Sequence, residues 1–163
     1  GIVSSAHCAD ISAVIAELEG LGAGVLEIDG TIEDLYSYTE RYLARRLGPD
    51  VGGRLHTGRS RNDLGATSGR MVLRETMLRL LGEFARLRQV VLDLAEDHRE
   101  TVMPGYTHCQ HAQPITMGYY FLAFADHLQR DWHRCVAALR HTNQSPLGAG
   151  ALAGTSFPLD RAY

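Results

Sequence analysis

The chain has 163 residues, of which 45% are apolar and 21% are charged, and its formal net charge is −3. This composition predicts one globular core and excludes a disordered or collagen-like chain. The small negative charge argues against a general nucleic-acid binder, because such proteins need excess cationic residues to displace counterions from phosphates.

The sequence also bears on cellular location. No apolar run approaches the roughly 20 residues that a membrane-spanning helix needs, and the first ten residues lack the basic start and apolar stretch of a signal peptide. We therefore predict a cytoplasmic protein with no membrane partner. Cys8, Cys109 and Cys135 have neither metal-type nor redox-type spacing, so we expect reduced thiols and no disulfide framework.

The first 30 residues carry the weakest pattern, and the glycines of residues 20–24 predict a flexible connection. A shorter helix is predicted over residues 31–47. Thr31 is a possible cap at its start, and Gly48 followed by Pro49 would stop it. Acidic residues near its start and arginines near its end suit the helix dipole.

Two long helices follow. From residue 64 to residue 99, apolar residues recur at three- and four-residue steps, which predicts an amphipathic helix about 50 Å long that ends before Pro104. A second apolar stripe begins at Met117 and ends near Asn143. No strand-like alternation is present. The predicted fold class is therefore all-α, with long helices of the kind found in extended bundles.

Three polar segments separate these elements, and we expect the chemistry there. The first, HTGRSRND at residues 56–63, directly precedes a long helix. Free backbone N–H groups at a helix start, joined by Arg59 or Arg61, suit a carboxylate or a phosphate. Ser60 and Asn62 could add neutral hydrogen bonds, or one of these polar residues could simply cap the helix.

The second segment, PGYTHCQHAQP at residues 104–114, places a hydroxyl beside an imidazole. Histidine exchanges protons near neutral pH, and the Thr107 hydroxyl could position or relay a proton. His108 is therefore a candidate general acid, with an ordinary loop contact as the alternative. His111 lies three residues further on, but no carboxylate or thiolate spacing completes a ligand set, so we predict no metal and no cofactor.

The third segment, SPLGAGALAGTSFPLDR at residues 145–161, has many small residues and few titratable side chains. Small residues permit close backbone approach and dipole contacts to a ligand. The alternative is a tight turn packed under neighbouring helices.

These three segments occur in the order and near the spacing found in argininosuccinate lyases, which this chain therefore resembles. In addition, EDLYSYTERYL at residues 33–43 is similar to the EDIHxxxExRL segment of that family, and SSAH at residues 4–7 to its early SxAH. The resemblance implies the fold of the fumarase and aspartase superfamily. It also implies a homotetramer with active sites shared by three subunits, and a place in arginine biosynthesis.

The resemblance further implies the reaction. A base removes a proton beside a carboxylate of a substituted aspartate, hydrogen-bond donors stabilise the aci-carboxylate, and the C–N bond breaks to release fumarate and an amine. Argininosuccinate is the implied small-molecule substrate. On the same basis, residues 1–53 would be an N-terminal helical part and residues 54–163 the first part of a central helical-bundle domain.

Carried onto this chain, the resemblance assigns catalysis to His108, aided by Thr107, which would protonate the departing nitrogen. The donors that would hold the two carboxylates come from three motifs, and one residue would face the amine. The residues assigned to substrate binding are Ser4, Ser60, Arg61, Asn62, Thr107 and, for the amine end, Gln110.

One family motif is absent: the GSSxMPxKxNP loop, which carries the serine taken as the base together with a lysine and an asparagine of the carboxylate site. Members of the family are also more than twice as long. We therefore expect a partial chain that lacks a C-terminal remainder and is inactive by itself.

Four departures bear on the substrate. Leu64, Tyr36, Thr39 and His111 stand where the family usually has glutamine, histidine, asparagine and arginine, so another N-substituted aspartate stays open as the substrate. A non-catalytic, crystallin-like derivative is the third alternative, against which the intact polar motifs argue. The sequence of the HTGRSRND motif favours the argininosuccinate branch over adenylosuccinate lyase.

Overall fold

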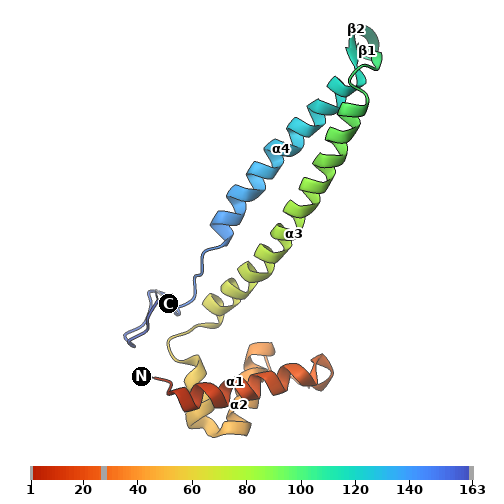
Figure 1. Cartoon of the computed structure of the whole chain (residues 1–163). Coiled ribbons are helices and arrows are strands. Elements are labelled where there is room, and N and C mark those ends of the chain that lie inside the picture. Colours follow the sequence, from red (N-terminus) through yellow and green to blue (C-terminus); the bar gives the residue numbers. More distant parts are fainter. Residues whose placement is uncertain (1, 27–28, 162–163) are drawn as a thin grey trace. The chain divides into compact units, whose positions relative to one another are not determined.

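The computed structural model describes residues 2–26 and 29–161. Its four helices are α1 (Ser5–Leu21), α2 (Leu35–Gly52), α3 (Arg61–Asp97) and α4 (Met117–Thr142) (Figure 1). Short 3₁₀ helices cover Ala23–Val25 and Gly53–His56, and one hairpin joins β1 (Val102–Thr107) to β2 (Gln110–Thr116). The predicted all-α class is confirmed, with this hairpin as an addition.

The chain divides into two compact units, one formed by the residues up to Thr67 together with those from Pro146 onward, and one formed by residues 68–145. The predicted boundary after residue 53 stays a prediction.

The first unit is built on α1 and α2. Ile11 and Val14 of α1 are buried against Leu43 of α2, which is only 1% exposed. Partly buried side chains from α2 and from the following 3₁₀ turn, including Val51 and Leu55, complete this cluster. The cluster holds residues 53–56, which lead into the first polar segment, against the helices.

Helix α2 begins at Leu35, four residues after the predicted cap. Asp34 is the N-cap, and its carboxylate accepts a hydrogen bond from the Ser37 backbone N–H at 2.7 Å. The prediction that Thr31 caps the helix is therefore wrong, and the Thr31 hydroxyl instead contacts Asp29 and Arg41. The predicted stop at Gly48 is confirmed, since its φ of 81° breaks the helix before a final turn.

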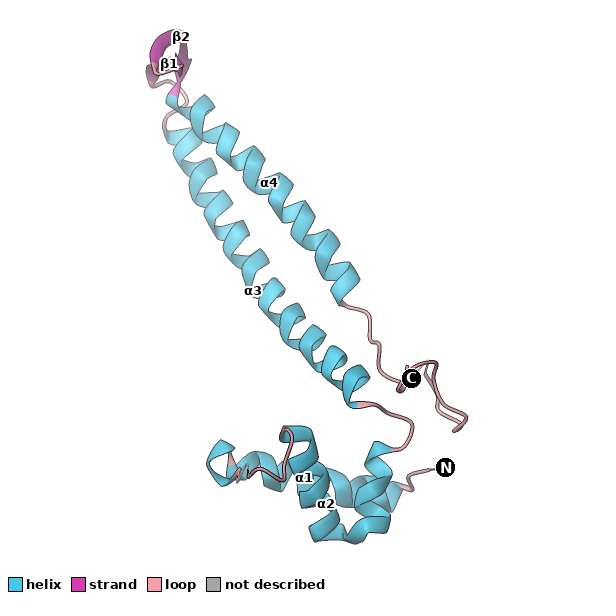
Figure 2. Ribbon diagram, turned by 180° about the vertical axis from the view of Figure 1, so that it is seen from behind, coloured by secondary structure: helices cyan, strands magenta, loops and turns pink. Residues whose placement is uncertain are grey.

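The second unit is an antiparallel pair formed by most of α3 and by α4, joined through the hairpin (Figure 2). Both long helices were predicted and both are confirmed. Near the hairpin the backbones approach closely at Gly118, where a Cβ atom would lie 2.5 Å from the carbonyl oxygen of Ala95. At the other end, Arg70 donates hydrogen bonds to the carbonyls of His141 and Gln144.

The hairpin was not predicted. Its two prolines, Pro104 and Pro114, are cross-strand partners, and a bulge follows between Pro104 and Tyr106. The two prolines supply no ladder donor and interrupt the apolar–polar alternation that normally identifies a strand in a sequence, and most residues of both strands are exposed. Gly105 sits at the bulge, where a Cβ atom would lie 2.8 Å from the Gln113 carbonyl oxygen.

The helix pair leaves much apolar surface uncovered. Among the described residues of this unit, Ala95, Gly118 and Ala125 are the buried ones, whereas Val72 is 61% exposed and Tyr119 is 64% exposed. No helix in the described ranges has the length and hydropathy that crossing a membrane requires.

Candidate functional site

The predicted site residues fall into two groups, one in each unit. Ser4, Ser60, Arg61 and Asn62 belong to the first unit, and the hairpin residues Thr107, His108 and Gln110 belong to the second.

Ser60 caps α3. Its hydroxyl accepts a hydrogen bond from the Asn62 backbone N–H at 3.2 Å, and the carboxylate of Asp63 accepts one from the Ser60 backbone N–H at 2.9 Å. The bond from Ser60 to Asp63 is one half of a capping box, with aspartate in the position that glutamate usually takes, whereas the Ser60 hydroxyl caps the second helical residue and not the third. The hydroxyl proton of Ser60 and the exposed amide of Asn62 can still donate to a ligand.

Asp63 links the first polar segment to the third. It is 5% exposed, and its Oδ2 atom accepts hydrogen bonds from the backbone N–H groups of Gly148 at 3.2 Å and Gly150 at 2.8 Å. Burial by itself raises the pKa of the Asp63 carboxyl, but the hydrogen bonds from Ser60, Gly150 and Gly148 outweigh it and lower that pKa.

The contact between Asp63 and the glycines bears on the two alternatives for the glycine-rich segment, which are dipole contacts to a ligand and a packed turn. Two of its backbone dipoles point at an internal carboxylate, as a packed turn would place them. Sequence reasoning missed Asp63, although the spacing of Ser60 and Asp63 fits a capping box and could have identified its local role. Nothing in the spacing connects it to residues 148–150.

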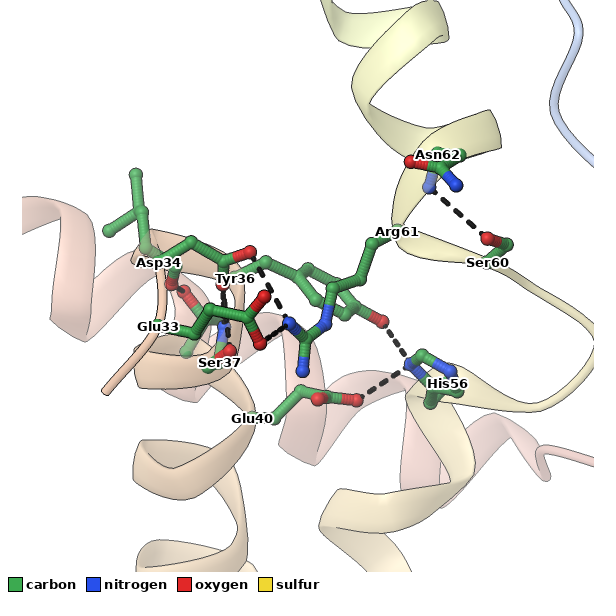
Figure 3. A network of polar contacts seen from close by, with 11 residues as sticks. Glu33, Asp34, Tyr36, Ser37, Glu40, His56, Ser60, Arg61 and Asn62 are labelled. Carbon is green, nitrogen blue, oxygen red and sulfur yellow. Dashed lines mark hydrogen bonds and ion pairs between the residues drawn. The ribbon is translucent and has the colours of Figure 1, made fainter. Parts of the chain in front are cut away.

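Arg61 is held by acidic residues that precede α2. Its guanidinium pairs with Glu33 and lies 3.6 Å from a carboxylate oxygen of Asp34 (Figure 3). The hydrogen bond and charge of Glu33 raise the pKa of Arg61, while the Ser37 backbone and hydroxyl lower the pKa of Asp34. A substrate carboxylate would therefore compete with Glu33 for this arginine.

Tyr36, Glu40 and His56 form a second polar cluster beside it (Figure 3). The Tyr36 hydroxyl oxygen lies 2.6 Å from Nδ1 of His56, and a Glu40 carboxylate oxygen lies 2.8 Å from the same nitrogen. Burial raises the pKa of Tyr36, so its phenol is neutral at pH 7. Sequence reasoning noted Tyr36 as a departure from the family but did not pair it with His56.

The hairpin tip carries the other group. Thr107 and Gln110 are cross-strand partners, so His108 and Cys109 alone form the turn. Their φ values are 51° and 60°, which is the left-handed region that a type I′ turn requires at both central residues. This conformation is strained for a residue that has a Cβ atom, and strain of this kind clusters at functional sites. All four residues are exposed.

Ser4 caps α1 by accepting a hydrogen bond from the His7 backbone N–H at 3.1 Å. Arg54 donates to the carbonyl of Ile2 at 2.9 Å, so the start of the chain is tied to the 3₁₀ turn that precedes the first polar segment. Arg59 is engaged locally by the Leu55 carbonyl.

The chemistry available is neutral and cationic hydrogen bonding for carboxylates and an exposed imidazole for proton transfer. Within residues 2–26 and 29–161, no cluster of three or more histidine, cysteine, aspartate or glutamate side chains has the geometry to hold a metal ion.

Comparison with known proteins identifies relatives that are all lyases. A family model described as "Lyase" matches residues 4–163. Argininosuccinate lyase of Streptococcus suis is 46% identical over 161 residues, covering 98% of this chain and 34% of that protein. Argininosuccinate lyase 1 of Shouchella clausii is 42% identical over 163 residues, covering 100% of this chain and 33% of that protein. The chain thus spans about a third of the length of the curated relatives it matches.

Solved structures of lyases are also similar to this chain. A crystal structure of EDDS lyase in complex with formate is 38% identical, with a TM-score of 0.89 over 99% of this chain and 31% of that chain. A fumarate lyase from Mesorhizobium sp. BNC1, 22% identical over 91% of this chain and 35% of that chain, has a TM-score of 0.70 and supports the fold alone. The chain therefore belongs to the lyase family, within the fumarase and aspartase superfamily.

Proposed function

We propose that this chain is part of a C–N lyase that eliminates an amine from an N-substituted aspartate and releases fumarate, with argininosuccinate as the substrate. The observation that carries this proposal is the similarity to argininosuccinate lyases, which extends over nearly the whole chain and includes all three polar segments. The protonation chemistry and the carboxylate binding of such an elimination both have candidate residues here.

Ser60 and Asn62 bind the succinyl carboxylates in this proposal. They lie at the start of a 37-residue helix, where backbone N–H groups and the positive end of the helix dipole favour an anion. Arg61 exchanges Glu33 for a substrate carboxylate, and Ser4 adds a further donor. Fixed donors of this kind stabilise the developing dianion by several kcal/mol.

His108 protonates the departing nitrogen, and Thr107 positions it. The support is the exposed imidazole at a two-residue turn, where the paired strands fix the backbone on both sides. Imidazole is the side-chain group that most often donates and recovers a proton in general acid–base catalysis. Gln110, the cross-strand partner of Thr107, faces the amine end of the substrate.

The active enzyme is proposed to be a cytoplasmic homotetramer of arginine biosynthesis in which different copies complete each active site. In it, residues 54–163 form the first part of the central bundle domain and residues 1–53 an N-terminal helical part. The support is the uncovered apolar surface of α3 and α4, which side chains such as Val72 and Tyr119 would bury against other helices.

A second candidate function is a lyase acting on another N-substituted aspartate. The similarity to EDDS lyase favours it, as does Tyr36, whose phenol occupies a position where the argininosuccinate lyases usually carry histidine. The two candidates share the reaction and differ in the amine.

The test is fumarate release by the purified full-length protein. Its intact mass is measured first, and absorbance of fumarate is then followed with argininosuccinate and, separately, with EDDS. Release from argininosuccinate supports the first candidate and release from EDDS alone supports the second. Release from neither contradicts the first candidate and rules out EDDS as the substrate of the second.

Two controls sharpen this test. A His108→Asn variant should lose activity while His133→Asn, on the exposed face of α4, should keep it. The 17.9 kDa chain by itself should be inactive, and turnover at that mass would contradict the expectation that the GSSxMPxKxNP loop is essential.

A further inference from the structure

We propose that Asp63 is a positioning residue: its buried carboxylate clamps the glycine-rich segment 146–154 onto the start of α3 and thereby fixes the cap that presents Ser60 and Asn62. The catalytic consequence rests on the proposed lyase function, whereas the clamp itself does not.

The two oxygens of Asp63 serve different parts of the chain. Oδ1 accepts the Ser60 backbone N–H at 2.9 Å, within the cap of α3. Oδ2 accepts the N–H groups of Gly148 and Gly150, the latter 87 positions away in the sequence, at 3.2 and 2.8 Å. A single carboxylate therefore joins the donor-bearing loop to a distant segment.

The glycine-rich segment is shaped around this carboxylate. Gly148 and Gly150 have φ values of 89° and 65°, a backbone that turns alternate N–H groups toward one point and forms an anion-binding concavity. A Cβ atom at Gly150 would lie 2.9 Å from the carbonyl oxygen of Gly154, so the loop closes on itself at that residue. Gly154 in turn donates to the Ala149 carbonyl at 2.6 Å.

A second contact between the same two segments is independent of Asp63. A Cβ atom at Gly58 would meet the side chains of Leu159 and Thr155, so the HTGRSRND loop and the end of the described chain pack together there as well. Removal of the carboxylate charge should therefore loosen the clamp without releasing the whole segment.

Burial makes this site sensitive to a small chemical change. Asp63 is 5% exposed, so water cannot replace a lost acceptor easily. In Asp63→Asn the size is kept, but the amide nitrogen is a donor and cannot accept from backbone N–H groups. Either the cap or the glycine segment must then lose its partner.

The experiment compares the full-length protein with its Asp63→Asn variant, and with Asp97→Asn as the matched control because Asp97 is an exposed carboxylate on the same helix. Hydrogen–deuterium exchange of residues 146–154 should rise about tenfold or more in Asp63→Asn, as expected for the loss of two buried hydrogen bonds. Exchange of α1 should not change. Unaltered exchange both in residues 146–154 and at the backbone N–H of Ser60 would overturn the clamp, because the single amide oxygen of asparagine cannot serve both partners.

Gly150→Ala disturbs the same contact through the glycine segment. It is the variant to measure if Asp63→Asn does not fold. It should raise exchange in the same segment, because a Cβ atom at Gly150 would lie 2.9 Å from the carbonyl oxygen of Gly154 and would displace the loop from Asp63.

Kinetics separate positioning from a merely structural role. If Asp63 fixes the carboxylate donors, KM for the substrate should rise at least about fivefold in folded Asp63→Asn, beyond any fall in kcat. An unchanged KM together with faster exchange would overturn the positioning role. If the unaltered full-length protein releases no fumarate, the proposed function fails, while the exchange measurement still decides the clamp.

Discussion

The hydroxyl oxygen of Tyr36 lies 2.6 Å from Nδ1 of His56, and Glu40 approaches the same nitrogen to 2.8 Å. One nitrogen thus faces two oxygens. If Nδ1 carries the proton, it donates to both oxygens, and the Tyr36 hydroxyl donates to Glu40, which closes a triangle of three hydrogen bonds. The triangle connects α2 to the 3₁₀ turn that leads into the HTGRSRND loop.

Tyr36→Phe should destabilise the protein by about 1 kcal/mol at pH 7, because a partly buried hydrogen bond is lost. Burial raises the pKa of Tyr36 above 10.0, so the stability that the protonated phenol contributes is present below pH 10 and is lost as the pH rises through the raised value. Urea unfolding should show that the free energies of unfolding of the unaltered protein and of Tyr36→Phe differ less above pH 10 than at pH 7. Tyr106→Phe, an exposed control on β1, should leave the free energy of unfolding unchanged at both pH values.

His108→Gly should separate turn geometry from chemistry. Glycine adopts positive φ without strain, so the variant should unfold at higher temperature, by an amount corresponding to about 1 kcal/mol. Activity should fall by about 10²-fold or more if the imidazole is the general acid. Thermal unfolding and kcat measured on one preparation provide both values.

Cys109→Gly is the control for that experiment, since it relieves the second left-handed residue and leaves the imidazole in place. It should be stabilised and active. Retained activity in His108→Gly would remove His108 from the reaction.

Glu33→Gln should release Arg61 from its strongest partner. The substrate carboxylate then no longer competes with Glu33, and KM should fall about twofold, an effect of the size expected for an exposed ion pair and reduced by salt. Steady-state kinetics at low and high ionic strength provide the measurement. Glu83→Gln, which breaks the exposed Glu83–Arg86 pair on α3, should leave KM unchanged. A higher KM in Glu33→Gln would show that the pair itself orients Arg61 for binding.

Asp63 should make folding acid-sensitive. Its pKa in the folded chain lies below the ordinary 3.8, so its carboxylate stabilises the fold above that pH and loses this contribution as the pH falls through the lowered value. The free energy of unfolding of the unaltered protein should exceed that of Asp63→Asn most clearly between about pH 5 and pH 7, and the gap should shrink below pH 4. A gap that stays constant down to acid unfolding would show that charge on Asp63 is not what the glycine segment binds.

Local patterns predicted the helices because each repeats over many turns. The apolar steps of α3 and α4 set those helices within a few residues, whereas the start of α2 was misplaced because Thr31 and Asp34 are both good caps. The hairpin was missed because Pro104 and Pro114 interrupt its alternation. The hydrogen bond from Gly150 to Asp63 could not be predicted from sequence periodicity, because it joins residues 87 positions apart.

The left-handed turn at His108 and Cys109 also limits how this protein can be improved by directed evolution. A library selected for heat resistance alone should enrich asparagine and glycine at these two positions, because that pair suits a type I′ turn best. Such clones would form a better hairpin and lose the imidazole. Selection for turnover must therefore accompany selection for stability if position 108 is to keep its histidine.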